Sequence, residues 1–150
     1  PYYIGFLWMK RKPAPLAVLV GIVAALSIPF LSWDAPAFIE STILYLSGNS
    51  LTSYPVSGYG LGMVLYEFGF IRDLGAYYPF IVWQLVVSVP ALVLGLRWLK
   101  KTMNVSMLIL VYSVTLFLFW YTSRYFNNSH VGFFSWIFAL GVLRHLDEKT

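Results

Sequence analysis

The densest group of chemically capable side chains in this sequence lies in one short polar stretch, residues 122–130. It holds a permanent cation, Arg124, with amide, hydroxyl and imidazole groups that include Asn127 and His130. A guanidinium presents a planar fork of donors that matches phosphate oxygens. Arg124 with Asn127 and His130 could therefore hold a phosphate or sugar hydroxyls. The competing interpretation is a hydrated turn in which Arg124 extends to lipid headgroups.

The other charged residues form no recognisable catalytic pattern. Glu67, Arg72 and Asp73 stand in an otherwise apolar stretch, where charge is costly unless it is paired or hydrated. Arg72 and Asp73 could equally form a solvated turn. The sequence has no cysteine, no phosphate-binding glycine motif and no zinc-hydrolase motif. We therefore expect no metal, no cofactor and no catalytic residue in this chain.

The composition indicates that lipid is the solvent for much of the surface. Hydrophobic residues make up 59% of the 150 residues and charged residues only 11%, whereas a soluble domain carries about 25% charged residues. The basic residues lie beside apolar runs rather than in a patch with polar neighbours, so we expect no nucleic-acid partner. The sequence thus predicts an all-α integral membrane protein.

Four uncharged stretches are candidates for membrane-spanning helices, because a crossing needs about 20 apolar residues, with a range of about 17–25. They are residues 16–32, 79–96, 105–121 and 131–143, the last being short unless it extends over 129–146. Residues 10–150 are therefore predicted to be a four-span domain. Residues 1–9, which are apolar and aromatic, resemble the tail of a preceding membrane helix or an N-terminal extension. The chain has no initiator Met, so we expect it to be a C-terminal piece of a larger protein.

The distribution of positive charge orients these four predicted spans. Segments 10–12, 97–101 and 144–149 hold eight of the ten Lys and Arg residues, and the alternate loops hold the other two. Because Lys and Arg resist translocation, the first set is expected on the cytoplasmic side. The sequence therefore predicts a multi-pass protein of the cell membrane, with residues 33–78 and 122–130 on the non-cytoplasmic side.

The long loop 33–78 is too apolar to be disordered and too long to be a simple connector. Asp34 is suited to cap a helix that has a proline in its first turn and ends near Gly48. This helix is expected to lie in the membrane interface. Residues 54–60 are rich in glycine and proline and predict turns, after which a second short helix is expected over 61–68.

Three short strings carry a resemblance to a known family: IPFLSWDAPAF at 28–38, YPVSGYGL at 54–61 and SRYFNN at 123–128. Their order resembles the C-terminal half of polytopic GT-C type glycosyltransferases of family 87, the mannosyltransferase-like group. The similarity extends over roughly residues 28–143. The resemblance implies a multi-span enzyme that takes a sugar from a polyprenyl-phosphate carrier at the outer membrane face.

The same resemblance implies roles for individual residues. The acidic catalytic base of such enzymes usually lies in a first outer loop that this chain does not contain. This chain would instead help to form the pocket for the lipid phosphate and the acceptor. Arg124 is the candidate for the phosphate, with His130 and Asn127 in support, and Asp34 and Tyr59 could contact sugar hydroxyls.

A different class of protein also fits the sequence, namely a small non-catalytic integral membrane subunit that packs against larger membrane subunits. The short fourth span and the lack of a visible acid/base pair agree with it. Gly21, Ala24 and Ala25 on the first span would allow close helix approach, which suits either interpretation. A transporter is disfavoured, because the predicted spans carry no charged residue.

Overall fold

The structure is a computed structural model that describes residues 2–50 and 52–148. About 75% of the described chain is helical, which confirms the predicted all-α class, and the rest consists of loops and two short strands. Its elements are α1 (Tyr2–Met9), α2 (Pro13–Ile39), η1 (Glu40–Leu44), α3 (Tyr45–Ser47), β1 (Ser57–Gly58), α4 (Leu61–Glu67), α5 (Phe80–Thr102), α6 (Val105–Tyr121), β2 (Tyr125–Phe126) and α7 (Asn128–Asp147).

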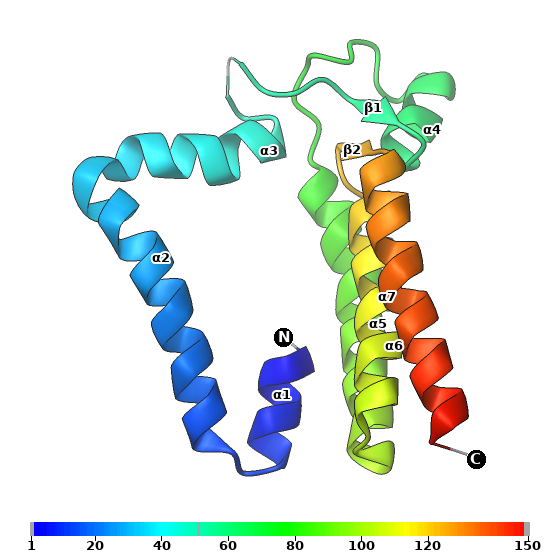
Figure 1. Ribbon diagram of the computed structural model, residues 1–150. Coiled ribbons are helices and arrows are strands. Elements are labelled where there is room, and N and C mark those ends of the chain that lie inside the picture. Colours follow the sequence, from blue (N-terminus) through cyan, green and yellow to red (C-terminus); the bar gives the residue numbers. More distant parts are fainter. Residues whose placement is uncertain (1, 51, 149–150) are drawn as a thin grey trace.

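Helices α5, α6 and α7 run side by side in alternating directions, and α6 packs against both neighbours (Figure 1). The turn between α5 and α6 is tight, because Asn104 caps α6 by accepting a hydrogen bond from the Met107 amide at 2.8 Å. Gly141 on α7 allows close approach to α6, since a Cβ there would lie 2.9 Å from the Leu110 side chain. These three helices form the bundle that positions the rest of the chain.

The short helix α1 closes one side of this bundle by packing on α5 and α6. The Tyr2 side chain is 1% exposed, and its hydroxyl donates to the Ala91 carbonyl at 2.9 Å. The same hydroxyl lies 2.8 Å from the Thr115 hydroxyl on α6. A buried core surrounds these contacts and consists of Tyr2, Phe6, Leu99, Met107, Leu108 and Val111.

Helix α2 stands apart from the bundle (Figure 1) and buries none of its residues. It bends at Asp34, whose backbone leaves the helical region (φ −150°, ψ 85°) and whose carboxylate accepts a hydrogen bond from the Ala37 amide at 3.0 Å. The chain then crosses toward the bundle and ends its helical course at Gly48, which has a φ of +88°. The predicted helix N-cap at Asp34 and the predicted helix end near Gly48 are both confirmed. The segment in between contains the π-helical turn η1, where the Ser41 and Thr42 hydroxyls bond to carbonyls of the preceding turn.

All four predicted spans are helical, as α2, α5, α6 and α7. Two helical stretches, Pro13–Leu44 and Phe80–Thr102, are long and apolar enough to cross a membrane. Helix α6 is apolar but has only 17 residues, which is the lower end of the range for a crossing. The predicted helices are thus confirmed as helices, whereas the arrangement of four crossings stays a prediction.

Candidate functional site at one end of the bundle

Arg124, the strongest candidate from the sequence, is only 2% exposed. Its Nε donates to the Tyr54 carbonyl oxygen, and its Nη1 donates to the Ala76 carbonyl oxygen at 2.9 Å. Its Nη2 donates to the carbonyl oxygens of Leu74 at 3.2 Å and Gly75 at 3.0 Å. Because a guanidinium has five N–H groups, one hydrogen on Nη1 remains without a bond among the described residues.

Backbone carbonyls replace the water that a free Arg124 side chain would bind. Burial lowers the pKa of Arg124, and the nearby Asp73 carboxylate partly opposes this shift. Among residues 2–50 and 52–148, Arg124 forms no ion pair with a carboxylate, whereas Arg144 pairs with Glu148. Each hydrogen bond to a charged group contributes about 1.5–3 kcal/mol. Arg124 therefore fastens two distant segments of the long loop to the end of α6.

Parallel pairing of β1 with β2 provides a second connection between the same regions. Ser57 pairs with Tyr125 and Gly58 pairs with Phe126, and the Tyr59 amide donates to the Phe126 carbonyl oxygen at 2.7 Å. Gly58 has a φ of +93°, and a Cβ at this position would overlap the Phe126 carbonyl oxygen. Only glycine fits there. The strands were not predicted, because two residues are too few to show an alternating pattern.

The loop encloses a small core of its own, made of Val56, Leu65, Ile71 and Phe80. Helix α4 covers this core and ends where Gly69 takes a φ of +77°, so the short helix predicted over 61–68 is confirmed. We call residues 54–78 and 122–127 the cap, and the end of the bundle that carries them the cap end. The cap is a folded unit because both a core and hydrogen bonds hold it.

Asn127 and His130 together begin α7. The Asn127 side-chain oxygen accepts from the Ser129 and His130 amides at 3.1 and 3.4 Å, and His130 Nδ1 accepts from the Asn127 amide at 3.2 Å. The imidazole lies among the rings of Trp120, Tyr125 and Phe126, with centroids 4.8, 5.5 and 5.8 Å away. This capping box occupies Nδ1 and leaves Nε2 as the ring atom for a ligand.

The two remaining predicted residues lie in different places. Tyr59 follows β1 in the cap, and its ring is 66% exposed. Asp34 lies at the bend of α2, and the contacts found for it in the described chain are local ones with residues such as Ala37. The structure thus brings Arg124, Asn127, His130 and Tyr59 to the cap end, and it shows no contact between Asp34 and the cap.

A cavity of about 260 Å³ lies beside the buried arginine. It is bounded by the end of the segment that follows α2, by the start of α5 and by the cap. Its polar lining comes from Ser47, Asn49, Gln84, Ser123 and Arg124, with the rings of Tyr77 and Tyr78 alongside. Gly48 packs directly on the Arg124 guanidinium, where a Cβ would overlap Nη1. Of the predicted site residues, only Arg124 reaches this cavity.

One cavity residue beyond the predicted ones, Gln84, is marked in the sequence. Gln84 is the only amide side chain within the four predicted spans, and such a polar residue in an apolar span usually has a specific partner. Its Nε2 donates to the Phe119 carbonyl oxygen at 3.2 Å, which leaves its side-chain oxygen available. Ser47 and Asn49 had no comparable signal, because they flank Gly48 at a predicted helix end, where polar residues are common.

Within the part of the chain that the structure describes, no three His, Asp or Glu side chains gather closely enough to hold a metal ion. The chemistry available at the cap end is therefore hydrogen bonding and positive charge. Comparison with family models, with curated proteins and with solved structures gives no match to this chain.

Proposed function

We propose that this chain is the C-terminal membrane portion of a glycosyltransferase that takes a sugar from a polyprenyl-phosphate carrier at the non-cytoplasmic face. In this proposal α2, α5, α6 and α7 are the four crossings, and the cap lies outside. The observation that carries it is the cavity beside Arg124, where donors, acceptors and tyrosine rings meet at the ends of two apolar helices.

The cavity lining suits a sugar phosphate chemically. Hydroxyl groups of a sugar need both donors and acceptors, which Asn49 and Gln84 supply through their amides. A departing phosphate needs positive charge close by. Arg124 offers the remaining Nη1 hydrogen and the field of a buried cation, while its other donors hold the cap in place. The base for the acceptor hydroxyl belongs to another part of the enzyme in this proposal.

The remaining candidates have secondary roles in this proposal. His130 and Asn127 do not line the cavity, so in this proposal they act indirectly, by fixing the start of α7 next to the turn that carries Arg124. Tyr59 would place its exposed ring against the acceptor sugar. Asp34 lies at the bend of α2, away from the cavity, so in this proposal it would contact the acceptor sugar from a different position than Tyr59 does.

The test uses Asn49→Leu, because Asn49 lines the cavity and is exposed, so its replacement should spare the fold. The measurement is transfer of a labelled hexose from polyprenyl-phosphate hexose by membranes that contain the intact protein. We expect kcat/KM to fall about tenfold, since one substrate hydrogen bond is lost. The matched control is Asn128→Leu, an exposed asparagine that does not line the cavity. Full activity of Asn49→Leu would rule out the cavity as the sugar site.

A non-catalytic membrane subunit is the second candidate, and α2 favours it. Helix α2 is apolar and buries none of its residues, and a Cβ added at Gly21 meets nothing within 4 Å. A larger subunit could pack there. Gly21→Leu should then reduce co-purification of that subunit and leave the cap intact, whereas a lipid-facing α2 would tolerate the change.

A further inference from the structure

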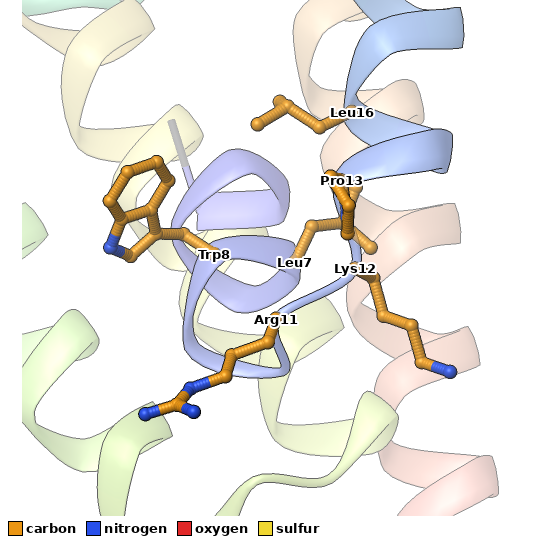
Figure 2. Close-up of a pocket in the computed structure, with 6 residues that line it drawn as sticks. All are labelled: Leu7, Trp8, Arg11, Lys12, Pro13 and Leu16. Atoms are coloured by element: carbon orange, nitrogen blue, oxygen red, sulfur yellow. The ribbon is translucent and has the colours of Figure 1, made fainter.

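A second cavity, of about 440 Å³, lies between α1 and the start of α2, at the end of the bundle opposite the cap. Its lining divides into apolar side chains, mainly Leu7, Trp8 and Leu16, and two cations, Arg11 and Lys12. In Figure 2, Leu16 reaches from α2 toward α1, and Arg11 and Lys12 extend from the connecting turn in different directions. The two cationic side chains therefore flank the turn on opposite sides (Figure 2).

The turn itself holds the Arg11 backbone in an uncommon conformation. The Lys12 amide donates to the Leu7 carbonyl and the Arg11 amide donates to the Trp8 carbonyl, each at 3.0 Å, which is the pattern that ends many helices. In this pattern the residue at the Arg11 position is left-handed and usually glycine. Arg11 has a φ of +51°. The chain thus keeps a cation where glycine would be less strained.

Neither cation of this turn is neutralised within the described chain. The ion pair between Arg144 and Glu148 involves neither Arg11 nor Lys12. The first acidic residue in the sequence is Asp34, which lies at the other end of the straight part of α2. The neighbouring Lys10 makes a cation–π contact, because its Nζ lies 4.8 Å from the centre of the Phe6 ring. An apolar cavity with two unneutralised cations complements a molecule that has an anionic head and an apolar tail.

We propose that this cavity binds one anionic phospholipid. Its phosphate would lie between Arg11 and Lys12, and its first acyl carbons would lie against Leu7, Trp8 and Leu16. The inference rests on the membrane placement within the proposed function and is independent of sugar transfer. The lipid would add contacts between α1 and α2, a helix that buries none of its residues.

The experiment titrates the purified full-length protein, in a nonionic detergent, with phosphatidylglycerol or with phosphatidylcholine of the same acyl chains. Native mass spectrometry counts the bound lipids. One phosphatidylglycerol should bind at least tenfold more tightly than phosphatidylcholine, because choline offsets the phosphate charge in the latter and each Lys or Arg near a net anionic lipid contributes about fivefold. The double variant Arg11→Gln/Lys12→Gln should bind the two lipids equally.

The matched control is Lys100→Gln/Lys101→Gln, which removes the same charge near the same end of the bundle, outside the cavity (Figure 1). It should bind phosphatidylglycerol as the unmodified protein does. A second variant, Arg11→Gly, removes the cation and relieves the positive φ, so loss of affinity in it does not come from unfolding. Glycerol phosphate, which has the headgroup chemistry without the tails, should not compete.

Several results would overturn the proposal: equal binding of the two lipids by the unmodified protein, equal loss in the control, unchanged affinity in Arg11→Gly, or effective competition by glycerol phosphate. Failure of the membrane placement itself has a different signature, namely a protein that stays monomeric and folded without detergent. Failure of the sugar-transfer proposal leaves all of these lipid measurements unchanged.

Discussion

Helices α6 and α2 are both apolar, yet α6 packs between neighbouring helices and α2 stands apart from them. Helix α6 buries five residues between α5 and α7, and two of these are the serines Ser106 and Ser113. Helix α2 buries none of its 27 residues. Apolar content therefore predicts that each segment is a helix, but it does not predict which helix finds a partner within the chain.

Small residues and polar cross-links mark the packed regions instead. Gly95 and Gly141 bring α1 and α7 into contact with their neighbours, and the Tyr2 hydroxyl joins three helices. The cap adds the four carbonyl bonds of Arg124. Helix α2 also has a glycine, Gly21, but it meets open space. The contrast is therefore between a region cross-linked within the chain and a helix that buries none of its residues.

The largest effect should come from Arg124→Met, which deletes the side chain that fastens the cap. Four carbonyl oxygens lose a charged donor, and even with partial rehydration the cost should be about 3 kcal/mol or more. We expect a lower thermal unfolding temperature in detergent and rapid proteolysis within residues 54–78. The matched control is Arg72→Met, because Arg72 is an exposed arginine of the same loop and should change stability by less than about 0.5 kcal/mol. An Arg124→Met variant as stable as this control would contradict the role of Arg124.

Gly58→Ala tests the pairing of β1 with β2. A left-handed conformation costs a non-glycine residue about 1–2 kcal/mol, and the overlap with the Phe126 carbonyl oxygen should add about 1–3 kcal/mol. Gly69→Ala is the control, because Gly69 also has a positive φ but has nothing within 4 Å of an added Cβ. The free energies of unfolding of the two variants, measured by chemical denaturation, should differ by the cost of the overlap. Equal losses of stability would argue against the strand pair.

Gly95→Ala and Gly21→Ala compare the packed and the unpacked regions directly. A Cβ at Gly95 would overlap the Tyr2 hydroxyl and displace it from Ala91 and Thr115, which should cost about 1–2 kcal/mol. The same change at Gly21 meets no atom and should be neutral or slightly stabilising, by up to about 1 kcal/mol. The measurement is the thermal unfolding temperature in detergent. A destabilising Gly21→Ala would show that α2 is packed after all.

The smallest effect concerns the end of α7 opposite the cap. The Ser106 hydroxyl donates to Glu148 Oε2 at 2.6 Å, and this bond, followed by Arg144, lowers the pKa of Glu148. A carboxylate with a lowered folded-state pKa stabilises the fold above its ordinary value of 4.5 and loses that contribution as the pH falls below it. Glu148→Gln should therefore lower the stability slightly near neutrality, change little at pH values well below 4.5, and so flatten the stability curve between the two. A curve that matches the unmodified protein throughout would exclude the contact.

The sequence was sufficient for the helices because each is marked by composition and by its ends. Asp34 and Gly48 were predicted to begin and end one helical segment. In the structure the Asp34 carboxylate accepts the hydrogen bond that begins this segment, and Gly48 has the positive φ that ends it. The connections within the cap could not be predicted. Arg124 bonds to carbonyls 48 to 70 residues away, and any residue can supply a carbonyl. The cavity beside it needs that long-range folding before its lining exists, so Ser47 and Asn49 carried no signal.

The most direct test of the folded cap uses the absence of cysteine in the natural chain. Ser57→Cys and Tyr125→Cys place a thiol on each partner of the β1–β2 register, at a separation that a disulfide can bridge. We predict rapid disulfide formation under mild oxidation, and a large loss of yield when Arg124→Met is added. The control is the pair Ser57→Cys/Asn128→Cys. A disulfide yield from Ser57→Cys/Tyr125→Cys that is no higher than the control yield would contradict the account. So would a yield that Arg124→Met does not change.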